Sequence, residues 1–394
     1  MIAGGDPDPV LGRYGFERHL SEQARAVLAD MVAQARAHIA PVMNDAWERA
    51  VMPEEVWGTL VPLNLMEPAG VSAEEADSSM FAGFRSFHLA RIDASVATMY
   101  NAQAGLFRAV VRHGSSPAQA AEWDPKVRRF EMTGVFALTE PEHGSDIAGG
   151  LATRARREGD EWVIDGAKRW IGGADAADVI AVFARDEADG QVKCFLVDRR
   201  ADGVDIEIIR GKVSLRPMQN AHITLTGVRV PDAMRAHGVN SWRDVAALLR
   251  RMRSDVAWMA AGVAAGALDA ALRYTRARAQ FGRPIGSFQL VQEKLARMLG
   301  NAIASVSLTV ALSAAQDAGV WSDENSALAK MVTAERAREN AALAREVMGG
   351  NGILLENDAA RFFADAEAVY SYEGTHEINA LIVGRSLTGA SAFV

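Results

Sequence analysis

Residues 134–165 read GVFALTEPEHGSDIAGGLATRARREGDEWVID, and this stretch decides the fold class. It contains the short runs GVFAL, ATRARR and EWVID, separated by turn signals such as Glu158-Gly159-Asp160. Short runs rich in β-branched or aromatic residues and bounded by turns are typical of strands. The pattern continues in VIAVFA (179–184), KCFLV (193–197) and HITLT (222–226). We therefore predict a small all-β domain, a barrel or a sandwich, over residues 133–235.

Helical patterns flank this region on both sides. One face of a 3.6-residue period between residues 24 and 39 carries Val27, Leu28, Met31, Val32, Ala35 and Ile39. A second apolar helix is predicted over 94–111, and Pro53 followed by two glutamates suits the first position of a helix. From about residue 236 onward the chain is rich in Ala, Leu and Arg at helical spacing. The order predicts an α+β protein with domains at 1–132, 133–235 and 236–394, not alternating βαβ units.

The composition excludes several classes of protein. The chain has 394 residues, of which 49% are hydrophobic and 23% charged, and its net charge of -8 argues against non-specific nucleic-acid binding. Cys194 is the only cysteine, so neither an intrachain disulfide nor a cysteine-based metal site is expected. No metal-ligand histidine pattern, GxSxG elbow or secretory signal is evident. The charge-free stretch 298–316 contains polar residues and is interpreted as a buried helix, not a membrane span. We expect a cytoplasmic protein.

Three segments have residues suited to contact a flat aromatic ring or a phosphate, and each also has a structural explanation. LTEPEHGSD (138–146) follows a strand and lets backbone N–H groups approach a ring or a phosphate, although a plain surface loop containing His143 looks the same. KRWIGG (168–173) offers Trp170 for stacking, or a core Trp in a strand. RAQFG (278–282), followed by Gln289, offers Arg278 for a pyrophosphate, or a solvated helix C-terminus.

Two further segments lie near the C-terminus. MGGNG (348–352) has the composition of a helix end that turns with positive φ, and a cofactor contact would add to that role. YSYEGTHEI (370–378) places Glu373 just before a helix that Thr375 is suited to cap. An exposed glutamate in a turn has the same spacing, so the spacing by itself does not identify Glu373 as catalytic.

Taken together and in this order, the five segments resemble the acyl-CoA dehydrogenase and oxidase family over residues 41–389. Likeness to the glutaryl-CoA dehydrogenase branch and the neighbouring plant short-chain acyl-CoA oxidase lies in APVM (40–43), KVSLR (212–216), VAW (256–258) and YEGTHEINAL (372–381). The resemblance implies a helical domain, a β domain and a C-terminal four-helix bundle. It implies a homotetramer, with a homodimer as the minimum unit, that holds FAD at subunit interfaces. It also implies a place in fatty acid metabolism, with an electron-transferring flavoprotein as partner and neither nucleic acid nor membrane.

The same resemblance implies a role for each residue. Glu373 would remove the α-proton of an acyl-CoA thioester while hydride passes from Cβ to flavin N5, giving a trans-2-enoyl-CoA. The flavin and its phosphates would contact Phe136, Leu138, Thr139, Gly144, Ser145, Trp170, Ile171 and Gly172. The adenine half of FAD and the pyrophosphate would contact Arg278, Phe281, Gln289, Gly349, Gly350, Thr375 and Glu377. The substrate would contact Ser145, Arg253 and Gly374.

Three positions depart from the patterns within the family. Gly172 stands where many of the dehydrogenases have a Thr hydroxyl near flavin N5, so the electron acceptor is either a flavoprotein or O2. Ala97 stands where the glutaryl-specific branch has an Arg, which disfavours a dicarboxylyl substrate and leaves Met99 and Tyr100 as candidates for an uncharged acyl pocket. Met252 stands at the alternative base position of some members, so Glu373 has no rival there. A non-catalytic flavin- or CoA-binding homologue is the remaining alternative, and acyl length and branching stay open.

Overall fold

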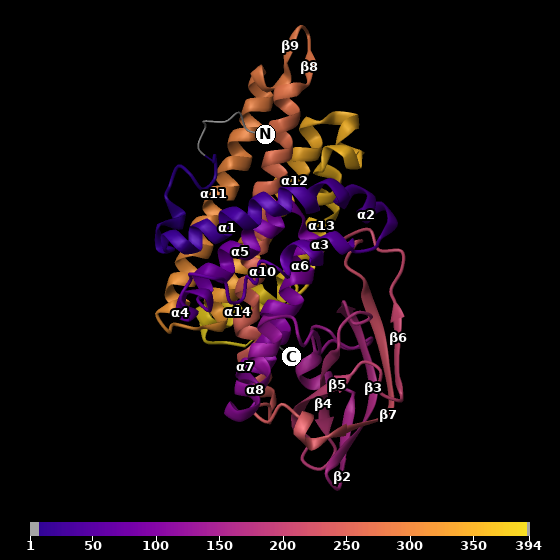
Figure 1. Ribbon diagram of the computed structural model, residues 1–394. Coiled ribbons are helices and arrows are strands. Elements are labelled where there is room, and N and C mark those ends of the chain that lie inside the picture. Colours follow the sequence, from indigo (N-terminus) through magenta and orange to yellow (C-terminus); the bar gives the residue numbers. More distant parts are fainter. Residues whose placement is uncertain (1–7, 392–394) are drawn as a thin grey trace. The chain divides into compact units, whose positions relative to one another are not determined.

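The computed structural model describes residues 8–391 and combines helices with a curled sheet (Figure 1). The chain divides into two compact units. The helical unit comprises the chain up to Thr98, residues 213–217 and the chain from Arg253 onward; the β unit comprises Met99–Lys212 and Met218–Met252. The predicted order of helices, sheet and helices is confirmed. The domain boundaries at 132 and 235 stay predictions, because the β unit also takes in helices on either side of the sheet.

The N-terminal helices begin at residues that the sequence marks well. They are α1 (Glu22–Gln34), α2 (Met43–Arg49), α3 (Glu54–Leu60), α4 (Ala73–Ala76), α5 (Ser79–Ile92) and α6 (Ala94–Asn101). Ser21 caps α1 by accepting a hydrogen bond from the Ala24 N–H at 3.1 Å. A π-helical turn, Ala35–Ile39, continues α1, so the predicted helix over 24–39 is confirmed. Pro53 lies directly before α3 as its N-cap residue, one position earlier than predicted.

The C-terminal region is helical, as predicted. Its helices are α10 (Trp242–Ala277), α11 (Gln289–Asp317), α12 (Asp323–Val347), α13 (Ala359–Ser371) and α14 (His376–Thr388). Helix α12 packs against α11, α13 and α14, and α5 packs against α11. Gly83 of α5 makes room for the indole of Trp258, since a Cβ at Gly83 would lie 2.2 Å from the indole nitrogen. That nitrogen donates to the Ser313 hydroxyl at 2.9 Å, which ties α10 to α11 in the buried core.

Two helices of the described chain, α10 and α11, have the length and apolar composition of a membrane span. In α10, 83% of the most apolar 18-residue stretch is buried in the protein, as in the core helix of a soluble protein. In α11, 44% of its most apolar 18-residue stretch is buried, and the charge-free residues 298–316 lie within this helix, as predicted. Composition of this kind is weak evidence for a membrane, and nothing else indicates one.

The β unit is built on one seven-stranded sheet. Its strands are β1 (Gly134–Ala137), β2 (Arg154–Glu158), β3 (Glu161–Gly172), β4 (Val179–Asp186), β5 (Val192–Asp198), β6 (Val204–Ile208) and β7 (Asn220–Pro231). The order is β1-β4-β2-β3-β7-β6, with β5 paired to β4. Strand β4 is parallel to β1 and β2, and the other pairs are antiparallel. All the predicted strands are present, and β6 was not predicted.

Both faces of the central strands are buried. Ile180 and Val182 of β4 belong to one apolar cluster, whereas Ala181 and Phe183 belong to another. The second cluster also contains Phe107, because helical segments of this unit cover that face: a π-helical turn (Ala102–Phe107), α7 (Arg108–His113) and α8 (Pro117–Arg128). Side chains alternate between the faces of a strand, so burial of both faces explains the nearly continuous apolar runs at 179–184 and 193–197.

Candidate active site

Glu373 lies in a sharp turn between α13 and α14. Its backbone φ is 51° and that of Gly374 is 90°, so two consecutive residues adopt the left-handed region. Glycine adopts this region without strain, whereas a glutamate does so only where the surroundings hold it. Thr375 then caps α14 by accepting from the Ile378 N–H at 3.3 Å, as predicted. The turn therefore projects Glu373 from a backbone that is fixed on both sides.

Two buried polar side chains hold this turn, and the sequence reasoning missed both. The Lys330 ammonium of α12 donates to the carbonyl oxygens of Tyr370 at 2.6 Å and of Gly374 at 2.8 Å. The Asn379 amide of α14 donates to the Gly374 oxygen at 2.9 Å and to the Thr375 oxygen at 3.0 Å. Buried polar groups are normally satisfied in this way, and here the satisfaction also fixes the turn. We call Lys330 and Asn379 the turn clamp.

The Glu373 carboxyl is in an unusual environment for an acid. The residue keeps some solvent contact, but its Oε2 atom is buried and accepts no hydrogen bond within the described chain. Burial raises the pKa of Glu373 to about 8; the Asp255 carboxylate pushes the pKa the same way, and Lys330 and Arg253 oppose it. A carboxyl whose pKa lies near neutral pH is suited to accept a proton from carbon.

Arg253 and Met252 follow each other on α10. Arg253, a predicted CoA contact, forms an ion pair with Asp323 at 3.4 Å, with most of its side chain buried. Met252 is buried in an apolar cluster of the β unit. The position of the alternative base therefore carries a side chain that cannot titrate.

The loop after β1 is anchored from within the β unit. Lys168 of β3 is fully buried, and its ammonium donates to Glu140 Oε1 at 2.8 Å and to the Leu138 carbonyl at 3.1 Å. Glu140 also accepts from the backbone N–H groups of Ala152 and Thr153 at 2.6 and 2.9 Å. Burial opposes the charge on Glu140, but Lys168 and these donors lower its pKa on balance.

The predicted flavin contacts of this loop differ in burial. Leu138 is buried, Phe136 and Thr139 are partly buried, and Gly144 and Ser145 are exposed. The His143 ring nitrogen Nδ1 lies 2.8 Å from an Asp146 carboxylate oxygen, and the residue is partly buried, in agreement with a residue near the surface. The loop thus has a buried, fixed base and an accessible outer part.

Trp170 interrupts β3 with a bulge. The register to β7 shifts between Lys168 and Ile171, and Trp170 has a φ of 67°. Its side chain is 52% exposed, so the alternative of a core Trp is wrong although the strand is confirmed. The Asn220 amide donates to the Trp170 carbonyl at 3.0 Å, and the Arg169 guanidinium lies 5.2 Å from the ring. An exposed aromatic ring on a fixed bulge is available for stacking.

Ile171 and Gly172 follow the bulge and are buried. A Cβ at Gly172 would lie 2.0 Å from Met218 Cε and 3.4 Å from the Asn220 amide nitrogen. Met218 therefore occupies the space that a side chain at position 172 would need.

The predicted adenine-binding residues lie at one end of the C-terminal helices. Helix α10 ends at Ala277, and a hairpin of β8 (Ala279–Gln280) and β9 (Arg283–Pro284) follows. Phe281 is 93% exposed at the tip of this hairpin, with a φ of 50°. Arg278, Gln289, Gly349 and Gly350 are exposed as well.

The glycine turn after α12 is joined to α10. Gly349 has a φ of 59°, as predicted for a helix end. The Tyr274 hydroxyl of α10 donates to the Met348 carbonyl at 3.4 Å and accepts from the Asn351 amide at 2.7 Å. The structure therefore brings the glycine turn close to the end of α10.

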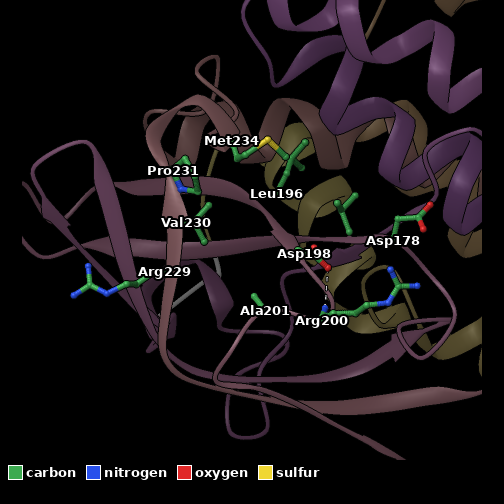
Figure 2. Close-up of a pocket in the computed structure, with 10 residues that line it drawn as sticks. Asp178, Leu196, Asp198, Arg200, Ala201, Arg229, Val230, Pro231 and Met234 are labelled. Atoms are coloured by element: carbon green, nitrogen blue, oxygen red, sulfur yellow. Dashed lines mark hydrogen bonds between the residues drawn. The ribbon is translucent and has the colours of Figure 1, made fainter.

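A pocket elsewhere in the β unit contains none of the predicted site residues. It is lined by Asp178, Val179, Leu196, Asp198, Arg200, Ala201, Arg229, Val230, Pro231 and Met234 (Figure 2). Figure 2 shows the Arg200 N–H donating to the Asp198 carboxylate, at 2.8 Å. Among residues 8–391, no group of His, Cys, Asp and Glu is arranged to hold a metal ion.

Comparison with known proteins decides the family. Models of the acyl-CoA dehydrogenase N-terminal, middle and C-terminal domains match residues 21–131, 135–228 and 241–388. The chain is 32% identical to cyclohex-1-ene-1-carbonyl-CoA dehydrogenase of Geobacter metallireducens, over 94% of this chain and 99% of that protein. This chain belongs to the acyl-CoA dehydrogenase family. The resemblance noted in its sequence is therefore confirmed.

Solved structures agree with this assignment. Glutaryl-CoA dehydrogenase from Mycobacterium smegmatis superposes with a TM-score of 0.90 at 32% identity, covering 99% of this chain and 100% of the other. A glutaryl-CoA dehydrogenase from the same organism, in complex with FADH2, superposes with a TM-score of 0.91 at 28% identity and the same coverage. The chain is thus an oxidoreductase acting on the CH–CH group of acyl-CoA, with FAD as its cofactor. The roles of individual residues stay predictions.

Proposed function

We propose that this acyl-CoA dehydrogenase family member oxidises the α,β-bond of an acyl-CoA thioester to a trans-2-enoyl-CoA, with Glu373 as the base. The observation that supports the proposal is the state of the Glu373 carboxyl. Its Oε2 atom is buried with no hydrogen bond from the described chain, and burial raises its pKa to about 8. A group in that state gains a proton readily and has a free lone pair for it.

The residues of both units fit FAD chemically. In the β unit, Trp170 offers an exposed ring on a fixed bulge, and Gly144 and Ser145 lie exposed on an anchored loop. In the helical unit, Arg278 and Phe281 offer an exposed cation and an exposed ring. Arginine forks and aromatic rings are suited to pyrophosphate and to adenine. Bound FAD would supply the oxidant that accepts a hydride from the substrate Cβ.

In the proposed reaction this chain's own groups handle the proton. The C–H bond at Cα breaks, the proton goes to Glu373, and the electron pair left behind forms the double bond as a hydride leaves Cβ. A thioester α-proton is a much weaker acid than a carboxyl, so donors to the thioester oxygen must stabilise the developing enolate. We assign the Glu373 backbone N–H as one of these donors and Arg253 as a contact of the CoA portion.

We further propose an uncharged acyl group. The side chains predicted to line the acyl pocket, Ala97, Met99 and Tyr100, are all buried and uncharged. Position 97 carries no cation that would pair with a second carboxylate.

The proposal includes an electron-transferring flavoprotein as electron acceptor, a homotetramer and a cytoplasmic location. Exposed apolar side chains such as Phe281, Leu290 and Ile353 in the helical unit suit burial in an assembly. A second candidate function, an oxidase that uses O2, is kept open by Gly172, where a hydroxyl is absent. Stopped-flow reoxidation of substrate-reduced enzyme in air separates the two, since rapid peroxide formation would contradict the dehydrogenase assignment.

The central experiment is anaerobic flavin reduction by a panel of acyl-CoAs that differ in length, branching and terminal charge. We expect bleaching of the flavin by uncharged acyl-CoAs and none by glutaryl-CoA. Glu373→Gln keeps the size of the side chain and should slow bleaching strongly, whereas Glu367→Gln, which alters an exposed ion pair between α13 and Arg338 of α12, should not. A protein that binds FAD but is not reduced by any acyl-CoA would be a non-catalytic homologue.

A further inference from the structure

Lys330 is a buried cation that the proposed reaction does not use. It lies on the face of α12 that also carries Ala327, Ala334 and Ala337, and none of these four side chains has more than 1% exposure. An ammonium taken out of water costs free energy unless polar groups compensate it. The groups that compensate Lys330 therefore indicate its role.

Both hydrogen bonds of Lys330 go to the backbone around Glu373. Tyr370 precedes the base by three residues and Gly374 follows it directly, and their carbonyl oxygens lie 2.6 and 2.8 Å from the ammonium. One side chain thus joins the last turn of α13 to the left-handed turn after it. Asn379 holds the same Gly374 oxygen from α14 but carries no charge.

The charges around Glu373 come from several helices. Helix α10 supplies Asp255, whose charge raises the Glu373 pKa, and Arg253, whose charge lowers it. Helix α12 supplies Lys330, which lowers it as well. Glu377 of α14 interacts with Lys330, and Tyr372 interacts with Glu373 itself. Burial lowers the pKa of Lys330 to about 8, with the two glutamates opposing that change.

We propose that Lys330 is a positioning residue for Glu373, which holds the turn by its two flanking carbonyls and supplies a buried positive charge that favours the carboxylate form. Its importance for turnover rests on the proposed function, whereas its effect on Glu373 does not. The two residues of the turn clamp then differ in role. Asn379 only fixes the position of the turn, whereas Lys330 fixes its position and also supplies a positive charge near Glu373.

The first test needs neither substrate nor turnover. The free energy of unfolding of FAD-saturated protein is measured from pH 5 to about 11 with and without Glu373→Gln, so that the range covers a Glu373 pKa raised by up to about three units. The stability gained by that substitution should grow with pH and level off near the Glu373 pKa of about 8. In the Lys330→Met background, the pH at which this gain becomes constant should rise by about one to three units. This is the range expected when an adjacent opposite charge is lost. Lys193→Met, which removes another buried lysine paired with Asp189, is the matched control and should not move it.

The second test follows flavin bleaching by butyryl-CoA against pH. Lys330→Gln keeps an N–H donor and loses the charge, so it should raise the midpoint pH (the inflection) of the bleaching rate, as Lys330→Met does. It replaces Lys330→Met in this test if that variant does not fold. Asn379→Ala should slow bleaching and leave the inflection where it is in the unaltered enzyme. If replacing Lys330 changed neither the midpoint pH of bleaching nor the pH dependence of the free energy of unfolding, the inference would be overturned. If no acyl-CoA bleaches the flavin, the proposed function fails, and the unfolding profiles still decide the role of Lys330.

Discussion

Removing the buried ammonium of Lys168 should destabilise the protein by about 3 kcal/mol at pH 7, toward the low end of the range for a broken buried ion pair. Lys168→Met fills the same volume but leaves the Glu140 carboxylate, itself 4% exposed, without its cation. The two backbone donors from Ala152 and Thr153 remain, and they limit the cost. A loss of this size is a large share of the total stability of about 5 to 15 kcal/mol that is usual for proteins.

The assay is denaturant unfolding at several pH values in a double-mutant cycle. In the unaltered protein the lowered pKa of Glu140 gives stability that is present above pH 4.5 and is lost as pH falls. Once Lys168 is replaced, burial dominates and raises that pKa, so the stability difference between the two proteins should widen from pH 4 to pH 7. Adding Glu140→Gln should recover most of the loss, because no buried charge is then left alone.

The Lys193–Asp189 pair is the matched control for this cycle. Its two atoms lie 2.9 Å apart, as close as those of the Lys168 pair, but Asp189 is 45% exposed. Lys193→Met should therefore cost less than about 1 kcal/mol. Equal costs for the two substitutions, or a cost for Lys168→Met that does not vary with pH, would refute the reasoning about burial.

Three more outcomes are expected. Glu373→Gln should slow anaerobic flavin reduction by about 10²- to 10⁴-fold, the usual contribution of a general base, and an unaffected rate would remove Glu373 from the mechanism. Because the folded pKa is about 8, kcat/KM should rise roughly tenfold per pH unit from pH 6 and level off above pH 8; a profile flat from pH 6 would contradict this. Gly172→Thr should cost no more than about 1 kcal/mol in denaturant unfolding, because the nearest atom that it meets is the terminal methyl of the flexible Met218 side chain, and a larger cost would contradict this reading.

Much of the fold could be predicted because its signals are local. The strands at 179–184 and 193–197 show as apolar runs, and Ser21 and Thr375 cap the helices that follow them. Strand β6 was missed although VDIEI alternates apolar residues with acids, which is the pattern of a strand with one exposed face. The association of residues 213–217 with the helical unit depends on contacts distant in sequence: Asp365 of α13 accepts from the Leu215 N–H at 2.6 Å.

The candidate site was less predictable than the fold. The exposure of Trp170 depends on a bulge in β3, and a run such as KRWIGG does not show where the register shifts. Lys330 did have a signal, since its spacing from Ala327, Ala334 and Ala337 places a lysine on the apolar face of a helix. What no local pattern shows is the partner of that lysine, because its acceptors lie 40 and 44 residues further along the chain.

The turn clamp also has a consequence for how the protein is made. The backbone that presents Glu373 is held by groups from α12 and α14, so both halves of the clamp are present only after synthesis has passed Asn379. Because α14 (His376–Thr388) is the last helix of the described chain, the sheet and the preceding helices are synthesised before the clamp is complete. A chain truncated before α14 would keep the sheet and Lys330 but lack Asn379, and with it half of the clamp around the proposed base.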